Sequence, residues 1–355
     1  MPNSTRFSVK AVILVLSLVV GAFLAEGLAR IFFPDWGPRT GGLSRFWTYD
    51  SSLGWVHIPN ANGVFSAFGR ATHVSINSRG FRDQERSYDR EASRYRIIAL
   101  GDSMVWGYGV QPDEIFTVLL ERACPRSEVI NLGVSGYGTD QELLLLQREG
   151  VRYNPDMVIV VVSPNDFQDN IQKKVYLVYQ KPMFELSPGG LRLTNTPVPT
   201  QTLWEHAASF LVRSSFVLNR AASVYHALSL EPLARSAATA YASIEAPFPR
   251  SLHERVTVAI LLEIEDVTRA AHATLLVVLT DGMEQRGREM EQFLRSRNIN
   301  VLNVDYDFGQ NDISRFHLRD GLHWNAAGHS KVAHRLSKYF EQQQNLSVRC
   351  RPGVS

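Results

Sequence analysis

Two short segments near opposite ends of the chain hold side chains that acyl-transfer chemistry needs. Gly101-Asp102-Ser103 is followed by Gly107 and Gly109, and glycines around a sharp turn let a serine hydroxyl face a substrate. In Asp320-Gly321-Leu322-His323 the carboxylate can reach the ring within one local turn and set its tautomer. A neutral histidine, with an unperturbed pKa of about 6.5, can then take the proton of a serine hydroxyl. Taken singly, each segment is also typical of a turn serine or a loop histidine.

Two further segments carry groups that can bind a negatively charged oxygen. One runs from Asn131 to Gly136, and the other is Ser163-Pro164-Asn165-Asp166. The Gly136 amide and the Asn165 side-chain amide are suitable donors to a developing oxyanion. A turn glycine and an asparagine at a helix N-cap are the alternative interpretations of these two residues.

A metal site is the competing hypothesis for the C-terminal segment. It would recruit His317, Asp320, His323 and His329. These residues are loosely spaced and include no thiolate, so the pattern does not favour zinc. We therefore expect neither a metal nor a cofactor.

Five short apolar runs predict the strands that must position these segments. They lie near residues 95–101, 127–133, 156–163, 273–280 and 299–305. Continuous hydrophobicity over so few residues is typical of strands buried on both faces of a parallel sheet. Ligands bind beyond the carboxyl ends of such strands, and Ser103, Gly136 and Asn165 follow the first three runs.

Amphipathic patterns between the runs predict helices. Apolar residues share one helical face in two segments, Phe116, Leu119, Leu120 and Ala123 in the first and Val332, Leu336, Tyr339 and Phe340 in the second. Thr139 with Glu142, and Ser251 with Glu254, have the spacing of capping boxes. Strand–helix alternation of this kind predicts a three-layer α/β/α domain with a five-stranded parallel sheet.

The order of these segments resembles the SGNH or GDSL-type hydrolase superfamily from about residue 94 to 343. The matching blocks are Gly101-Asp102-Ser103, Gly136, Pro164-Asn165-Asp166 and Asp320-Gly321-Leu322-His323. The resemblance implies a flavodoxin-like fold with Ser103 as nucleophile, His323 as general base and Asp320 orienting the histidine. It also implies an oxyanion hole from the Ser103 amide, the Gly136 amide and the Asn165 side chain.

Two features depart from the family pattern. The family usually has glycine two residues before the asparagine, where this chain has Ser163, and Pro164 stiffens the approach. Residues 171–250 form a larger insertion than compact members carry and hold seven of the 16 prolines. We predict no strand there and one helix near Leu203 to Leu228. Whether that helix covers the site, lies on the membrane or binds another protein stays open.

The N-terminus predicts a membrane anchor. Residues 11–25 carry no charge, and the apolar pattern extends to 33, long enough for a helix to cross a hydrocarbon core. Glu26 and Arg30 can pair at the interface, and Arg6 and Lys10 place the N-terminus in the cytoplasm by the positive-inside rule. A cleaved signal peptide ending near Gly27-Leu28-Ala29, or a buried helix, are the alternatives. The first two interpretations both put the remaining chain in the periplasm or outside the cell.

The expected domain organisation follows from these patterns. Residues 1–34 form the cytoplasmic tip and single-pass anchor, and 35–93 form a strand-and-loop preface without its own core, with a small strand at Thr72–Ile76. The hydrolase-like domain covers 94–343 with the insertion at 171–250, and 344–355 form a tail.

Composition limits the partners. Lys and Arg number 37 against 35 Asp and Glu, a net charge of +2, which argues against a dedicated nucleic-acid binder. We expect an acyl-ester substrate, an acylated carbohydrate among the options, and contact with the membrane through the N-terminal helix. Nothing in the sequence identifies a protein partner.

Cys124 and Cys350 are the two cysteines, too few for a disulfide scaffold or a Cys-rich metal module. Cys124 follows the first predicted core helix, and Cys350 follows the last, which ends near residue 342. In the resembled fold these helices lie on the same side of the sheet. We expect the two to form a disulfide in an oxidising compartment, with two unpaired thiols as the alternative.

Three functions are compatible with the sequence. The first is an exported ester hydrolase, esterase- or deacetylase-like, that uses Ser-His-Asp acyl-enzyme chemistry. The second is an O-acyltransferase that passes the acyl group to a cell-envelope polysaccharide with the same triad. The third is a non-catalytic envelope carbohydrate-binding module, which the competent residues at every catalytic position argue against. The acceptor, water or a sugar hydroxyl, discriminates the first two.

Overall fold

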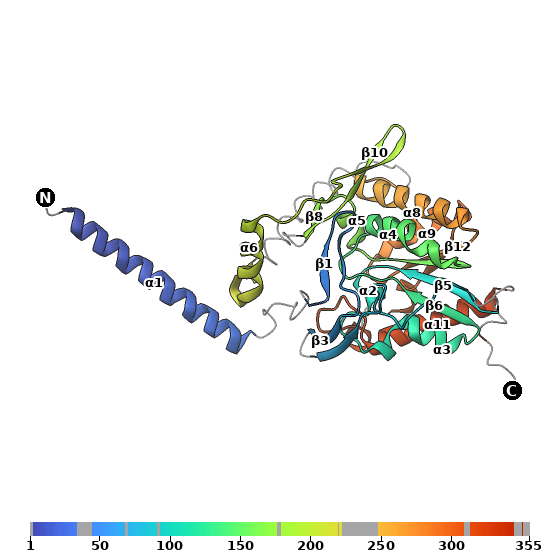
Figure 1. Ribbon diagram of the computed structural model, residues 1–355, viewed down its shortest axis with the longest axis horizontal. Helices are drawn as coiled ribbons and strands as arrows, with labels where there is room; N and C mark the ends of the chain where they lie inside the picture. The colour runs from blue at the N-terminus through green and yellow to red at the C-terminus, as the bar shows by residue number, and fades with distance from the viewer. Residues whose placement is uncertain are drawn as a thin grey trace. The chain divides into compact units, whose positions relative to one another are not determined.

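The computed structural model describes residues 3–33, 45–67, 70–90, 93–175, 179–218, 220–221, 248–308, 313–343 and 350. The chain divides into two compact units (Figure 1). One contains α1 (Asn3–Phe32) and α6 (Leu203–Ser214), and the other contains all remaining elements.

The larger unit is built on a five-stranded sheet. Its strands are β5 (Tyr95–Leu100), β6 (Ser127–Asn131), β7 (Met157–Val162), β12 (Thr274–Leu279) and β13 (Asn300–Asn303). They are all parallel, in the order β13-β12-β7-β5-β6. The predicted sheet and its five strands are confirmed. The apolar runs form strands because every residue of β7, for example, is buried by layers on both faces.

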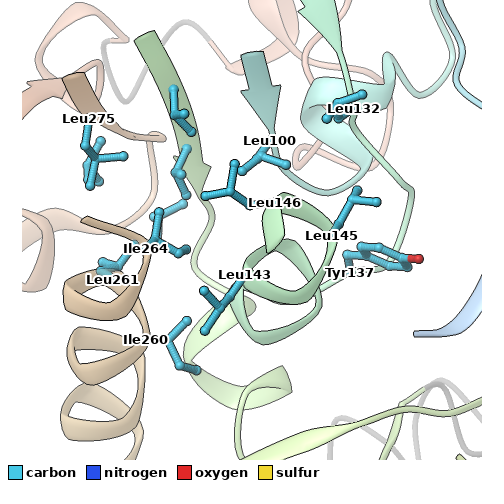
Figure 2. Packing of buried hydrophobic residues seen from close by; sticks show 14 of the residues in the cluster. Leu100, Leu132, Tyr137, Leu143, Leu145, Leu146, Ile260, Leu261, Ile264 and Leu275 are labelled. Atoms are coloured by element: carbon cyan, nitrogen blue, oxygen red, sulfur yellow. The ribbon is translucent and has the colours of Figure 1, made fainter. Parts of the chain in front are cut away.

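Helices cover both faces of this sheet, as predicted. Side chains alternate across a strand, so Ile98 and Leu100 of β5 pack into one cluster and Ile97 and Ala99 into another. The first cluster lies under α4 (Thr139–Arg148), α8 (Leu252–Ala270) and α9 (Glu284–Arg295), and the second under α3 (Phe116–Ala123) and α11 (Ala326–Gln342). Figure 2 shows the first cluster, with Leu143 of α4 beside Ile260 of α8.

The segment before β5 forms two antiparallel hairpins. They are β1 (Trp47–Asp50) with β2 (Gly54–His57), and β3 (Asn62–Ala67) with β4 (Arg70–Ser75). Phe65 and Val74 pack against Trp106 of α2 (Ser103–Trp106) in a third cluster. The hairpins therefore share their core with the main domain and brace the short helix that begins at Ser103.

The insertion contains strands, so our prediction of none was wrong. Two antiparallel pairs occur, β8 (Lys174–Val175) with β9 (Tyr179–Gln180), and β10 (Met183–Ser187) with β11 (Gly190–Thr194). The Ser187-Pro188-Gly189-Gly190 stretch forms the turn between β10 and β11, where Gly190 has a φ of +105°. Leu186 and Leu191 pack on the core that α8 covers. This tertiary partner stabilises strands too short to stand out in the sequence.

The predicted insertion helix is interrupted at Ser215, and residues 216–218 and 220–221 are helical again. α6 ends at Ser214, and residues 222–228 of the prediction lie outside the described residues. Further short elements in the described residues are α5 (Asp166–Asp169), α10 (Ile313–Phe316) and the 3₁₀ turns Pro112–Glu114, Gly150–Tyr153 and Asp305–Asp307.

One of the two predicted capping boxes is present. Ser251 Oγ accepts from the Glu254 amide at 3.1 Å, and a Glu254 oxygen accepts from the Ser251 amide at 3.0 Å. Thr139 is not a cap, because α4 has Gly138 at its N-cap and Thr139 as its first residue. Its hydroxyl instead accepts from Asn170 Nδ2 at 2.6 Å, a tertiary contact that the local pattern could not reveal.

α1 contains a 23-residue apolar span, Lys10–Phe32. Its most apolar 18 residues have a mean hydropathy of 2.4, and none of them is buried. It is long and apolar enough to cross a membrane, and a signal sequence would meet the same criteria. The predicted Glu26–Arg30 contact is present at 2.8 Å.

The predicted disulfide is present. Cys124, which ends α3, is bonded to Cys350, 226 residues away, and both side chains are buried in the cluster beneath α3 and α11.

Candidate active site

A tight strand–turn–helix connection presents Ser103 at the carboxyl end of β5. Asp102 Oδ1 caps α2 by accepting from the Met104 amide at 2.9 Å, which leaves Ser103 as the first helical residue. A Cβ on Gly101 would meet Val105 at 2.2 Å, and Gly107 ends the helix with a φ of +84°. Glycine is therefore required at Gly101 for packing and favoured at Gly107 by backbone conformation.

Ser103, His323 and Asp320 converge although 220 residues separate the serine from the histidine. Ser103 Oγ lies 2.8 Å from His323 Nε2, and His323 Nδ1 lies 2.5 Å from Asp320 Oδ2. Asp320 Oδ1 accepts from the amides of Leu322 and His323 at 3.1 and 3.2 Å. Although burial opposes the charge on Asp320, these hydrogen bonds and His323 together lower its pKa below the usual value.

Further side chains hold the His323 ring and its loop, in roles that the sequence analysis did not predict. The ring of Tyr108 stacks on His323 with centroids 4.3 Å apart. Trp324 Nε1 donates to Asp281 at 2.8 Å, and His317 Nε2 lies 2.7 Å from the same carboxylate. Asp281 lies two residues after the last residue of β12, so its place at the carboxyl end of a parallel strand was a usable signal.

Asn165 lies between β7 and α5, and its side chain is directed at two carboxylates. Its Nδ2 donates to Asp169 Oδ2 at 3.0 Å and to Asp102 Oδ2 at 3.4 Å. Asn165 occupies the N-cap position of α5, but its side chain makes no capping bond. The side-chain amide is thus held next to the residue that precedes Ser103, which the capping alternative does not explain.

Several buried acids near Asn165 interact with one another. Asp102, Asp140, Glu142 and Asp166 are buried, and Lys181, fully buried itself, pairs with Asp140. Burial and mutual repulsion raise the pKa of Glu142 and Asp166 well above the usual range. Burial also raises the pKa of Asp169 to about 6, despite the hydrogen bond from Asn165.

The loop after β6 packs against the turn that carries Ser103. Val134 donates its amide to the Gly101 carbonyl at 3.0 Å, and Asn131 Nδ2 donates to the Val105 carbonyl at 2.8 Å. A Cβ on Gly133 would meet the Trp106 amide nitrogen at 2.5 Å, so this approach requires glycine. Gly136, in the same loop, is buried with a φ of +83°.

The histidines of the metal hypothesis have separate partners. His329 Nδ1 accepts from the Phe116 amide at 3.2 Å inside the core, and His317 pairs with Asp281 rather than with Asp320 or His323. In the described part of the chain, no group of three or more His, Cys, Asp or Glu is arranged to hold a metal ion.

Comparison with known families identifies the class of protein that this domain represents. Residues 97–336 match the family described as GDSL-like lipase/acylhydrolase, which is more than half of the chain. The protein is therefore an ester-bond hydrolase. It belongs to the GDSL-like lipase/acylhydrolase family, as the resemblance of its sequence blocks implied.

Solved structures with low sequence identity are similar to this chain. The psychrotrophic esterase EstA from a Pseudoalteromonas species is 14% identical, with a TM-score of 0.41 and coverage of 70% of this chain and 98% of that chain. A family 3 carbohydrate esterase from Clostridium thermocellum is 13% identical, with a TM-score of 0.39 and coverage of 69% and 94%. A lipolytic protein of the G-D-S-L family from Veillonella parvula is 11% identical, with a TM-score of 0.41 and coverage of 70% and 100%. No curated protein matches the sequence.

Proposed function

We propose that the protein is a membrane-anchored ester hydrolase in which Ser103, His323 and Asp320 form the catalytic triad of an exported domain. The observation that carries the proposal is the continuous chain of contacts from Ser103 Oγ through the His323 ring to Asp320. The catalytic domain covers residues 94–343, with the insertion at 171–250.

In the first half of the reaction, Ser103 Oγ attacks the carbonyl carbon of the ester and its proton passes to His323 Nε2. The imidazolium that forms is stabilised by Asp320, whose carboxylate keeps the other ring proton on Nδ1. His323 then returns the proton from Nε2 to the leaving alcohol, and the acyl group stays on Ser103.

In the second half, His323 Nε2 takes a proton from a water molecule that attacks the acyl-enzyme. The tetrahedral intermediate collapses, the proton returns to Ser103 Oγ and the free acid leaves. The alternative acceptor, a sugar hydroxyl, would use the same steps and give an acylated sugar.

The oxyanion of both tetrahedral intermediates is assigned to the amides of Ser103 and Gly136 and to Asn165 Nδ2. Asn165 can take this role because one of its two carboxylate contacts, that to Asp102, is long at 3.4 Å. An oxyanion would replace this weak contact, while the 3.0 Å bond to Asp169 keeps the amide oriented.

Two features support export of the domain. Arg6 and Lys10 precede the apolar span, which favours a cytoplasmic N-terminus. The Cys124–Cys350 bond is of a kind that persists in oxidising compartments outside the cytoplasm.

The activity test uses the full chain in detergent with a short acyl ester, with and without a sugar acceptor. We expect free acid from the wild type. We also expect Ser103 Oγ to bond to the phosphorus of a fluorophosphonate, with fluoride released as the leaving group and the serine proton taken by His323 Nε2. Ser103→Ala should lose both signals, while Ser296→Ala, a surface serine at the end of α9, should keep them. Turnover by Ser103→Ala equal to that of the wild type would refute the assignment of Ser103 as nucleophile. Acylated sugar as the main product would show that the protein is an acyltransferase and not a hydrolase.

The topology test uses membranes from a bacterial expression host. We expect the chain to resist alkaline extraction, to keep residues 1–34 by intact mass, and to be digested by protease added outside spheroplasts. A mature chain that starts after residue 29 would show a cleaved signal peptide instead of an anchor.

A further inference from the structure

α6 carries an apolar stripe that faces solvent. Leu203, Trp204, Ala207, Phe210 and Leu211 follow the spacing that places residues on one side of a helix. Trp204 is 82% exposed, Leu203 81% and Phe210 69%, values far above those of an apolar helix face that packs on a core. The start of the helix is stabilised locally, since Thr202 and Glu205 form a capping box there.

The end of α6 is fastened to α1. The Glu26 carboxylate accepts from Ser215 Oγ at 2.8 Å and from the amide of Phe216 at 3.0 Å. Arg30 donates to the carbonyl of Ser214 at 2.8 Å, and its guanidinium lies 4.8 Å from the centre of the Phe216 ring. These contacts join α6 to the last two turns of α1 and lie within one compact unit.

This attachment sets the depth of α6 if α1 crosses a bilayer. Glu26 and Arg30 are the charged residues at the C-terminal end of the apolar span, and charged groups near a span end are stabilised at the headgroup level. The end of α6 that they bind must lie at the same level. Tryptophan is enriched in that zone because its ring is apolar and its indole N–H is polar.

We propose that α6 lies in the plane of the bilayer interface, with Leu203, Trp204, Phe210 and Leu211 directed at the acyl chains. The inference rests on the proposed membrane anchor. The occupant of the stripe is lipid, because the stripe is tied to the end of a helix whose exposed surface is itself assigned to lipid. α6 thereby adds a second, surface-lying contact to the single span.

The test places a polarity-sensitive fluorophore at three positions of the full chain in phosphatidylcholine–phosphatidylglycerol vesicles. Trp204→Cys reports on α6, Leu18→Cys on the span, and Val64→Cys, an exposed apolar residue of the other unit, is the matched control. The native cysteines are bonded to each other and do not label without reductant. Depth is measured by quenching from lipids spin-labelled near the headgroup or deep in the acyl chain.

We expect the Trp204 probe to be quenched most by the shallow label, at a depth of about 5–10 Å below the headgroups. The Leu18 probe should be quenched most by the deep label and the Val64 probe by neither. A Leu18 probe in lipid with a Trp204 probe that behaves like Val64 would overturn the inference and leave the anchor standing. A Trp204 probe shielded from water but not quenched by lipid would overturn it in favour of a protein partner. A Leu18 probe outside the lipid would refute the anchor and the inference together.

Discussion

Replacing Asp320 by asparagine tests the triad with little change in shape. Two backbone amides, those of Leu322 and His323, donate to Asp320 Oδ1, so the oxygen of an asparagine must face them. Its NH₂ group then takes the place of Oδ2, 2.5 Å from His323 Nδ1. A donor at that place forces Nδ1 to be an acceptor and moves the ring proton to Nε2. The nitrogen that faces Ser103 can then no longer accept a proton.

The expected loss of kcat is large and the loss of stability is small. In a serine hydrolase with preserved geometry, the wrong histidine tautomer lowers kcat by about 10⁴. This corresponds to roughly 5.5 kcal/mol in the activation free energy. The free energy of unfolding should fall by no more than about 3 kcal/mol, because one charge-assisted hydrogen bond is lost and both backbone bonds remain.

The assay is kcat for a p-nitrophenyl ester, with urea unfolding of the same samples. Asp266→Asn, which replaces a surface aspartate paired with Arg269 on α8, is the matched control and should keep wild-type kcat. A loss below about tenfold in Asp320→Asn, in a folded protein, would contradict the tautomer argument.

Three further outcomes are expected. Asn165→Ala should lower kcat by about 10²–10³ with KM little changed, and an unchanged kcat would exclude it from the oxyanion hole. Despite burial, Asp281 raises the pKa of His317, so the pair stabilises the fold fully below the unfolded pKa, about 6.5, and less as pH rises through the folded value. As the pH rises through the folded-state pKa of His317, urea unfolding should show the wild type losing stability relative to His317→Gln. Parallel curves of unfolding free energy against pH for the two proteins would disprove this. The Cys124–Cys350 bond joins residues that are 226 positions apart, so reducing it should lower the unfolding free energy by up to ~5 kcal/mol. Equal urea midpoints with and without reductant would contradict this.

The strands could be predicted because their signal is local. A strand covered on both faces needs an unbroken apolar run, and the run from Met157 to Val162 is visible without knowledge of its neighbours. Ser251 and Glu254 were predictable for the same reason, since both partners of the capping box lie within one turn. Thr139 had the same spacing but is not a cap, because α4 has its N-cap at Gly138, and the Thr139 hydroxyl bonds Asn170, 31 residues further along the chain.

The active-site residues could be predicted from their residue types and short sequence motifs, whereas the contacts that hold them in place could not. The sequence placed Ser103 and Asn165 after strands, but the carboxylates of Asp102 and Asp169 that hold the Asn165 amide are ordinary acids in the sequence. Only the fold buries these two carboxylates beside Asn165, and burial raises the pKa of Asp169 to about 6. Tyr108 likewise became relevant when the fold stacked it on His323.

By itself, the sequence determined the parallel sheet and the apolar N-terminal span, because each depends on residue type and short spacing. It also limited the cysteines to one possible pair, because the chain has only two of them. The tertiary structure decided which distant groups meet. Ser103 and His323 are 220 residues apart, and their 2.8 Å contact depends on the order in which five strands pair. The same holds for α6, whose apolar stripe is local but whose attachment to Glu26 and Arg30 is not. A hydrogen bond requires its two atoms to lie about 3 Å apart, whatever their separation along the chain, so only the folded chain could specify these contacts.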